Sequence, residues 1–363
     1  MTDKRIDDRY STNERFTTLR GIEAEARKQL SPVVWNYLNC GTGDEVTLRA
    51  NTADFDTLSF RTPLFAGISN PDTSTEFLGH RLSFPALIAP FGGGEQLLDP
   101  QGHCATGRAA AAVGIRQIVP VAAAHSLETI AAATGVAQMF QITFVGKVDS
   151  VLAMIERAKD AGYEQIVATY SPIRQWRERM MEDRFTIRTA MEDSNYSPDK
   201  SDPEMLREQL AFAHKRWGWD EARAVIANSP LPVIVKGVME AEEASRCMEA
   251  GALGLYVSNY GGRSIDRMPS AISALPKVRA AVSKDTPIIF DSGVRRGSDI
   301  AAAIALGANA VALGRSVGYG LAADGEMGAR RVLELLKSEF WTTLGHLGCS
   351  TVEELNPDVL YPQ

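Results

Sequence analysis

The sequence contains no long apolar run, and this absence argues against a membrane-spanning protein. No stretch approaches the ~20 apolar residues that a helix needs to cross a bilayer. The polar start, MTDKRIDDRYSTNERF, lacks the apolar centre of a secretion signal. The final residues, LYPQ, lack a peroxisomal address of the SKL kind. We therefore expect a cytoplasmic protein that does not bind a membrane.

Cysteine, histidine and positive charge are also scarce. The four cysteines and five histidines are scattered, without the spacing of a metal or redox site, so we expect buried, reduced thiols and no metal. Lys and Arg number 38 against 45 for Asp and Glu, which gives a net charge of -7. Without a basic stripe to neutralise phosphates, binding to nucleic acid is not expected, and a small molecule is the expected partner.

The sequence does contain eight short apolar runs that alternate with helix-like, often alanine-rich stretches. Parallel strands that are buried on both faces read as continuous apolar runs of this kind. Eight strand–helix units over ~250 residues are typical of an α/β protein with the (β/α)8 TIM barrel fold. An open doubly wound sheet is the competing fold, but the glycine run at 92–94 lacks its G-x-G-x-x-G spacing. The predicted strands are residues 84–90, 115–121, 138–144, 165–170, 232–237, 254–259, 287–293 and 310–315.

Two regions lie outside this alternation. Residues 1–60 are predicted to form an N-terminal helical segment, broken near Ser31 and Pro32, ahead of a barrel at 61–363. Residues 172–230, after the fourth predicted strand, form a long and charged interval. We interpret this interval as a lid or insert loop, with a helix toward its end at 202–227. No internal repeat or second domain is visible.

Polar residues gather at the carboxyl ends of the predicted strands, where barrel active sites lie. The strings DSGVRRG at 291–297 and LGR at 313–315 follow the last two strands, the usual place for a phosphate site in such barrels. Their glycines permit close approach of the backbone, while Arg295 and Arg315 add positive charge. We therefore predict that these two loops bind a phosphate group.

Lys236 ends the apolar strand VIVK, a position that favours a functional lysine over one that reaches to the rim. It could form a Schiff base with a carbonyl substrate. It could also place positive charge beside an electron-accepting ring such as a flavin. The residues alone leave both alternatives open.

On its motifs the chain resembles the FMN-dependent α-hydroxy acid dehydrogenases and oxidases, the glycolate and lactate oxidase group. The resemblance runs from about residue 20 to about residue 350. It implies FMN as cofactor, a small carboxylate-bearing substrate, and a homo-oligomer that in this family is often a tetramer. The features that carry it are LIAP at 87–90, Gln141, VKG at 235–237, VSN at 257–259, G-x-R-x-x-D at 261–266, DSGVRRG at 291–297, ALGA at 305–308 and GR at 314–315.

The resemblance also implies roles for individual residues. Lys236, Tyr260 and Arg263 occupy the family's catalytic positions. Arg263 and Tyr37 would bind the substrate carboxylate. Thr143 would lie beside the substrate, and the second arginine would be Arg177 or, as an alternative, Arg174. The residues implied in binding FMN are Ala89, Pro90, Phe91, Gln141, Thr169, Lys236, Ser258, Asp291, Gly293, Arg295, Gly314 and Arg315.

The chain departs from the family at the residue that removes a proton from the substrate. The family has a histidine where this chain has Tyr260. A phenol has a pKa near ~10 and an imidazole near ~6.5, so Tyr260 is a poor base at neutral pH. Thr143 replaces a family tyrosine, the turn at 169–172 lacks the family's aspartate, and PVAAA at 120–124 replaces a segment with serine and tryptophan. We predict a retained flavin site with altered proton transfer.

Three functions fit these departures. The first is an FMN-dependent oxidoreductase that takes a hydride from a CH–OH or CH–NH donor onto flavin N5, with Tyr260 as a hydrogen-bonding or proton-relaying group. The second is a flavin-dependent reductase or non-redox isomerase that uses Tyr260 as an acid, a role that suits a phenol at neutral pH. The third is a catalytically silent flavin-binding protein.

Overall fold

Eight parallel strands close into a barrel, as predicted. The computed structural model describes residues 15–92, 94–170, 176–185, 195 and 217–361. Around the barrel the strand order is β10-β3-β4-β5-β6-β7-β8-β9, and β10 pairs with β3 through Leu313 and Ile88. The strands are β3 Ala86–Ile88, β4 Arg116–Pro120, β5 Met139–Thr143, β6 Gln165–Thr169, β7 Val233–Val238, β8 Gly254–Val257, β9 Ile288–Phe290 and β10 Ala310–Leu313.

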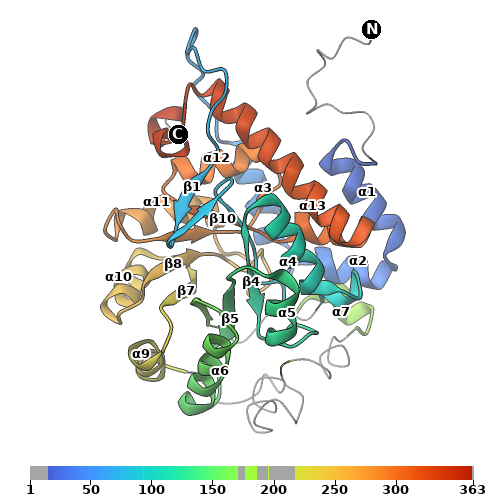
Figure 1. The fold of residues 1–363 in the computed structure, drawn as a ribbon, viewed down its shortest axis with the longest axis vertical. Helices are drawn as coiled ribbons and strands as arrows, with labels where there is room; N and C mark the ends of the chain where they lie inside the picture. Colours follow the sequence, from blue (N-terminus) through green and yellow to red (C-terminus); the bar gives the residue numbers. More distant parts are fainter. Residues whose placement is uncertain (1–14, 93, 171–175, 186–194, 196–216, 362–363) are drawn as a thin grey trace.

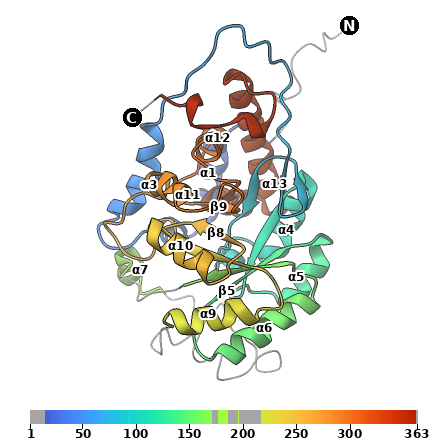
Figure 2. The same cartoon turned by 90° about the vertical axis from the view of Figure 1, so that its left-hand side faces the viewer.

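Helices surround the strands on the outside (Figures 1 and 2). Their apolar faces pack on the outward-facing strand residues, while a second set of apolar side chains, including Leu87 and Ile234, fills the barrel interior. The core therefore has the two layers expected when both faces of every strand are buried. The surrounding helices are α4 Gly102–Val113, α5 Leu127–Thr134, α6 Val148–Asp160, α9 Trp219–Asn228, α10 Ala241–Glu249, α11 Ala271–Ala280, α12 Gly297–Ala305 and α13 Arg315–His346.

Residues 19–56 of the N-terminal segment are largely helical, with an interruption where the sequence predicts it. Helix α1 (Leu19–Gln29) ends before Ser31, whose hydroxyl accepts from the amide of Val34 and so caps α2 (Pro32–Asn39). Helix α3 (Val46–Asp56) follows. Helix α1 packs along α13, and α2 packs against α7 (Glu178–Glu182) (Figure 1). These contacts bring α1 and α2 to the barrel, although the division at residue 60 stays a prediction.

Several short elements are not visible in the sequence pattern. They include a hairpin of β1 (Thr75–Phe77) and β2 (His80–Leu82), α7, and the 3-10 helices η2 (Glu95–Leu97), η4 (Val352–Glu354) and η5 (Pro357–Val359). The helix expected at 202–227 is confirmed over 219–227, as part of α9. Residues 217 and 218 precede this helix, and residues 202–216 lie outside the described ranges.

The cysteines agree with the sequence prediction. Cys40, Cys104, Cys247 and Cys349 are all free and buried. Within the described ranges, no group of three or more potential metal ligands comes together. No helix in those ranges combines the length and the apolar composition needed to cross a bilayer.

Candidate active site

Lys236 lies at the centre of a buried polar cluster at the carboxyl ends of β7, β8 and β9. Its Nζ donates to Ser258 Oγ at 2.8 Å and to Asp291 Oδ2 at 2.6 Å. The side chain is only 6% exposed. Burial lowers the pKa of Lys236, and the charge and hydrogen bond of Asp291 oppose that shift. The predicted lysine, serine and aspartate are therefore brought together as one unit.

The carboxylate of Asp291 is held by four side chains. Oδ2 accepts from Lys236 and from the hydroxyl of Tyr256 at 2.8 Å. Oδ1 accepts from the hydroxyls of Ser258 at 2.5 Å and Ser292 at 2.8 Å. A carboxylate offers about four acceptor positions, so these donors fix its orientation. Tyr256 and Ser292 were not among the predicted site residues.

Tyr260 occupies the position of the family histidine, but its hydroxyl is hydrogen-bonded to the main chain. The O–H donates to the carbonyl of Tyr170 at 2.6 Å and lies 3.3 Å from the carbonyl of Lys236. The backbone of Tyr260 is left-handed, with φ of 59°, and its amide donates to Ser258 Oγ at 3.0 Å. A Cβ on Gly237 would overlap the phenol oxygen. The structure thus places Tyr260 across the ends of β6, β7 and β8, and its catalytic role stays a prediction.

Two arginines face the ring of Tyr37, which α2 carries to the mouth of the barrel. The Cζ atoms of Arg263 and Arg177 lie 4.9 Å and 5.9 Å from the ring centroid. Arg263 also donates to the carbonyl of Leu38 at 3.3 Å. Tyr37 itself is 2% exposed, and its hydroxyl donates to the carbonyl of Gly92 at 3.2 Å. Three of the predicted substrate residues, Tyr37, Arg177 and Arg263, are therefore brought together, while the alternative, at 174, lies outside the described residues.

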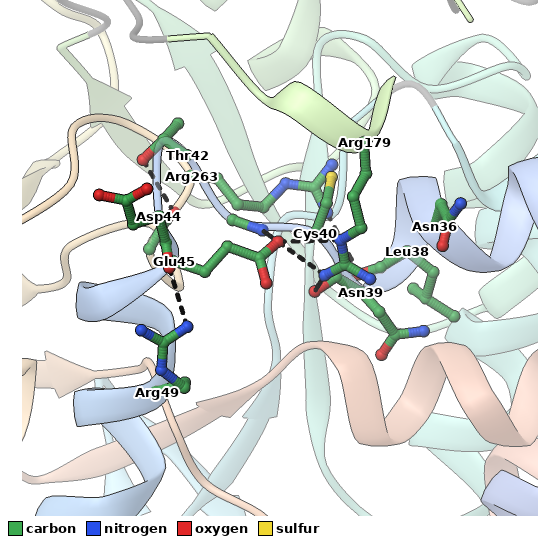
Figure 3. A network of polar contacts seen from close by, with 12 residues as sticks. Asn36, Leu38, Asn39, Cys40, Thr42, Asp44, Glu45, Arg49, Arg179 and Arg263 are labelled. Atoms are coloured by element: carbon green, nitrogen blue, oxygen red, sulfur yellow. Dashed lines mark hydrogen bonds and ion pairs between the residues drawn. The ribbon is translucent and has the colours of Figure 1, made fainter. Parts of the chain in front are cut away.

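We call the group of Tyr37, Arg177 and Arg263 the arginine subsite. A polar network around Glu45 fixes α7 next to it (Figure 3). Arg179, on α7, donates to Glu45 Oε1 at 2.7 Å and to the carbonyl of Asn39 at 3.1 Å. The same Oε1 accepts from the amide of Gly41 at 2.9 Å. The loop between α2 and α3 is also held in place, because the amide of Thr42 donates to the carbonyl of Gly262. This network links α2, α7 and the loop after β8.

Apolar and aromatic groups lie beside the two arginines. Met180, from α7, clusters with Tyr37 and Cys40. The rings of Phe185 and Phe91 lie 5.5 Å and 6.4 Å from that of Tyr37. The subsite therefore combines cationic groups with an apolar surface. Met180 and Phe185 were missed in the sequence because the region around them carries no recognisable motif.

The two predicted phosphate loops adjoin each other near the arginines. The Arg315 guanidinium, at the start of α13, is buried and donates to the carbonyls of Leu38, Cys40 and Gly261. Burial, and then the charges of Arg263 and Arg295, lower the pKa of Arg315 to about 9. A bound anion would relieve the repulsion among these cations, as a phosphate site requires.

Gly293 and Gly314, in these two loops, are required to be glycine for different physical reasons. Gly293 has φ of +98°, and a Cβ there would collide with the carbonyl oxygen of Asn51 on α3. Its lack of a side chain is thus required by packing on α3, a reason that the phosphate prediction did not include. At Gly314 the nearest atom to an added Cβ would be that of Ala89, 4.0 Å away. Gly314 therefore borders open space, as expected for a backbone that approaches a ligand.

The remaining predicted cofactor residues lie along the ends of β3, β5 and β6. Thr143 pairs with Thr169, and Thr169 pairs with Lys236, so they form a row across three strands. The buried Thr169 Oγ1 has no hydrogen-bond partner among the described residues, while Gln141 Nε2 donates to Thr143 Oγ1 at 3.3 Å. A ring with a polar edge would satisfy such an atom. Ala89, Pro90 and Phe91 follow β3, which β4 separates from β5 in the barrel.

Comparisons with known proteins found similar sequences and similar solved structures. Residues 26–362 match the family described as FMN-dependent dehydrogenase. The peroxisomal (S)-2-hydroxyacid oxidase GLO3 of Arabidopsis thaliana is 33% identical over 336 residues, which are 91% of this chain and 92% of that protein. Glycolate oxidase of Spinacia oleracea is also 33% identical, over 94% of each chain. Crystal structures of mandelate oxidase, one with benzoyl-formic acid, superpose with a TM-score of 0.86 at 32% identity, covering 96% of this chain and 98% of theirs.

Proposed function

Because the chain belongs to the FMN-dependent dehydrogenase family and is an FMN-dependent, hydroxy acid oxidase-like oxidoreductase, we propose that it oxidises a small carboxylate-bearing substrate without a histidine base. The observation that carries this proposal is the contrast between two parts of one site. Lys236 keeps its buried cluster and Arg263 keeps its place beside Tyr37, whereas the position of the base holds Tyr260, whose hydroxyl donates to a main-chain carbonyl.

Bound FMN would supply the ring that accepts a hydride from the substrate. The Lys236 ammonium would stabilise negative charge that develops at that ring, an effect that is large in a buried, preorganised site. Gln141, Thr169 and Ser258 would line the ring, and Asp291 would hold Lys236 in position. The loops of Arg295 and Arg315 would bind the phosphate.

The substrate would bind between the arginines and the apolar surface. Arg263 and Arg177 would pair with its carboxylate, since a guanidinium matches the geometry of two carboxylate oxygens. Phe91, Met180 and Phe185 favour an apolar or aromatic side chain on the substrate. Mandelate oxidase, which is similar in structure, is named for an aromatic hydroxy acid.

The missing base favours a donor that needs little help in losing a proton. An alcohol must give up its O–H proton as the hydride leaves, and a positioned base typically contributes about 10²- to 10⁴-fold to such a step. At neutral pH the nitrogen of a 2-amino carboxylate is mostly an ammonium, which first releases one proton to water. The neutral amine then forms the C=N bond with its own lone pair as the hydride leaves, and the resulting iminium needs no base in that step. We therefore propose a CH–NH donor, with Tyr260 in a supporting role.

The test is stopped-flow absorbance at the flavin band of the purified holoenzyme. Matched 2-amino and 2-hydroxy carboxylates with the same aromatic side chain are mixed with the oxidised enzyme. Amino acids should bleach the band at least about 100-fold faster than their hydroxy counterparts. Equal rates, or faster bleaching by hydroxy acids, would contradict the proposed donor. Purification without FMN would contradict the whole assignment.

The same apparatus addresses the reductase alternative, in which Tyr260 supplies a proton. Dithionite-reduced enzyme is mixed anaerobically with an unsaturated carboxylate. Rapid reoxidation, together with no bleaching by any amine or alcohol, would support reduction. The present geometry favours oxidation because the Tyr260 proton is directed to the Tyr170 carbonyl.

A further inference from the structure

Tyr256 is an unusual residue for the place it occupies. It lies on β8 inside the barrel and is 0% exposed, among aliphatic side chains such as Leu87, Ile234 and Ile289. An aliphatic residue would suit this environment without the need to satisfy a buried hydroxyl. The hydroxyl is satisfied by Asp291 Oδ2 at 2.8 Å. Tyr256 therefore makes a specific connection between the barrel interior and the polar cluster above it.

The ring of Tyr256 also supports the ammonium of Lys236. Nζ lies 3.7 Å from the ring centroid, well within the range of a cation–π interaction. The ring of Tyr260 lies at 5.5 Å, and Ser258 and Asp291 accept the hydrogen bonds. The ammonium is thus held both by oxygen acceptors and by an aromatic face.

This contact matters because burial works against the charge on Lys236. Removing an ammonium from water disfavours its charged form, and burial accordingly lowers the pKa of Lys236. A cation–π contact is strongest where water is excluded, as it is here. Burial also raises the pKa of Tyr256 well above its usual value, so the phenol stays neutral and keeps donating to Asp291.

We propose that Tyr256 is a positioning residue that keeps the Lys236 ammonium charged and in place, and that it thereby raises the reduction potential of bound FMN. The inference rests on the FMN-dependent function proposed above. Positive charge beside the ring stabilises the reduced cofactor, which carries more negative charge, over the oxidised one. Tyr256 would act through Lys236, because its ring contacts the ammonium and its hydroxyl donates to the Asp291 oxygen that accepts from the same ammonium.

The proposal includes a pH dependence with a definite sign. The groups described as facing Lys236 are Asp291 after β9, Tyr256 on β8 and Tyr260 after β8. The lysine charge is present below the pKa of Lys236 and is lost as pH rises through it. Removing the aromatic ring would lower that pKa further. A variant without the ring of Tyr256 should therefore lose the lysine charge at a lower pH than the unaltered enzyme. The reduction potential of its bound FMN should begin to drop at that lower pH.

The experiment compares two substitutions in the holoenzyme. Tyr256→Phe keeps the ring and removes the O–H, whereas Tyr256→Leu removes both. The midpoint potential of bound FMN is measured against a reference dye during dithionite reduction, across neutral and alkaline pH. For Tyr256→Leu, reduced FMN should lose about tenfold in binding relative to oxidised FMN, about 30 mV for a two-electron couple. The gap should widen as pH rises, and Tyr256→Phe should keep most of the potential.

A double-substitution cycle identifies the route of the effect. Lys236→Met should lower the potential at least as much as Tyr256→Leu, and adding Tyr256→Leu to it should change nothing further, because both act through one charge. Additive losses would overturn the proposal. If the leucine variant does not fold, Tyr256→Met serves as a second apolar replacement, since methionine adapts to irregular space.

Two results separate this inference from the proposed function. A Tyr256→Leu or Tyr256→Met enzyme that binds FMN at the original potential at every pH would show that Tyr256 is only a packing residue. A fall as large in Tyr256→Phe as in Lys236→Met would show that the hydroxyl, and not the ring, carries the effect, against the proposal. If instead the proposed function is wrong, the unaltered protein would bind no FMN.

Discussion

The hydroxyl of Tyr260 lies between the main-chain carbonyls of Tyr170 and Lys236, at the ends of two neighbouring barrel strands. The left-handed backbone of Tyr260 costs about 1 kcal/mol or more for a residue other than glycine. Hydrogen bonds from its amide to Ser258 and from its hydroxyl to the carbonyl of Tyr170 offset this cost. Its phenol also lies against Gly237. A phenolate here would face carbonyl oxygens, which cannot donate to it.

Tyr260→Phe should therefore affect stability more clearly than chemistry. Loss of the hydroxyl should lower the free energy of unfolding by about 1 kcal/mol in urea denaturation. Turnover should stay within about tenfold, whereas loss of a true base would cost about 10²- to 10⁴-fold. Tyr163→Phe is the matched control, because that buried hydroxyl donates to the carbonyl of Leu127. A Tyr260→Phe enzyme that binds FMN but turns over about 100-fold more slowly would show that the Tyr260 hydroxyl takes part in catalysis.

The sequence indicated many of the residues that the structure brings together, and the exceptions have physical reasons. Lys236, Arg263 and Tyr37 were recognisable because polar groups at strand ends and familiar motifs mark a barrel site. Tyr256 was not, because an aromatic residue inside an apolar run reads as core. The contact of Glu45 with Arg179 joins distant segments, and neither residue lies in a motif.

At the scale of elements, α7 should control substrate binding through its anchor. Arg179→Met removes the ion pair with Glu45. In that pair the Arg179 side chain is 34% exposed and the Glu45 side chain is 24% exposed. A pair that meets this much solvent is worth up to about 1 kcal/mol, so KM should rise by up to about fivefold with little change in kcat. Steady-state kinetics with the best donor would measure this.

A control on another helix makes that result specific. Arg223→Met on α9 removes a more exposed ion pair with Asp220, at 3.7 Å. It should leave KM unchanged. An equal change in both variants, or a fall in kcat confined to Arg179→Met, would contradict the assigned role of α7.

The contact between α3 and the loop after β9 should be intolerant of any side chain. Gly293→Ala combines a positive φ with a collision against the Asn51 carbonyl, so it should cost about 3 kcal/mol or more. Gly135→Ala is the control, since Gly135 also has a positive φ, +66°, but a Cβ there would meet nothing within 4 Å. Urea denaturation should show a loss of only about 1 kcal/mol for the control. Similar losses in both would mean that backbone strain alone matters at 293.

The barrel elements were more predictable than the short ones. Each of the eight apolar runs overlaps a barrel strand, because burial on both faces leaves a continuous apolar signal. The β1–β2 hairpin was missed, since its strands have three residues each and this length gives almost no periodicity. The helix predicted to end at residue 227 ends at Asn228 in α9, a difference of one residue that is usual because helix ends are poorly marked by propensity.

At the scale of the whole molecule, FMN should stabilise the fold through widely separated parts of the chain. Its predicted contacts run from Ala89 after β3 to Arg315 at the start of α13. Saturation at about 100 times Kd should add about 2.7 kcal/mol to the free energy of unfolding. Riboflavin, which lacks the phosphate, should add much less at equal concentration, as measured by thermal or urea unfolding. Equal stabilisation by both would contradict a phosphate site at Arg295, Gly314 and Arg315.

Cytoplasmic location and homo-oligomerisation stay predictions.

The pairing of β10 with β3 determines when the site can exist during synthesis. Chains emerge from the ribosome at about 5–20 residues per second, and β3 (Ala86–Ile88) is made long before β10 (Ala310–Leu313). Until then β3 lacks one of its two neighbours, and an open strand edge is a template for pairing with other nascent chains. A chain truncated before residue 310 should therefore sediment as aggregates and retain no FMN.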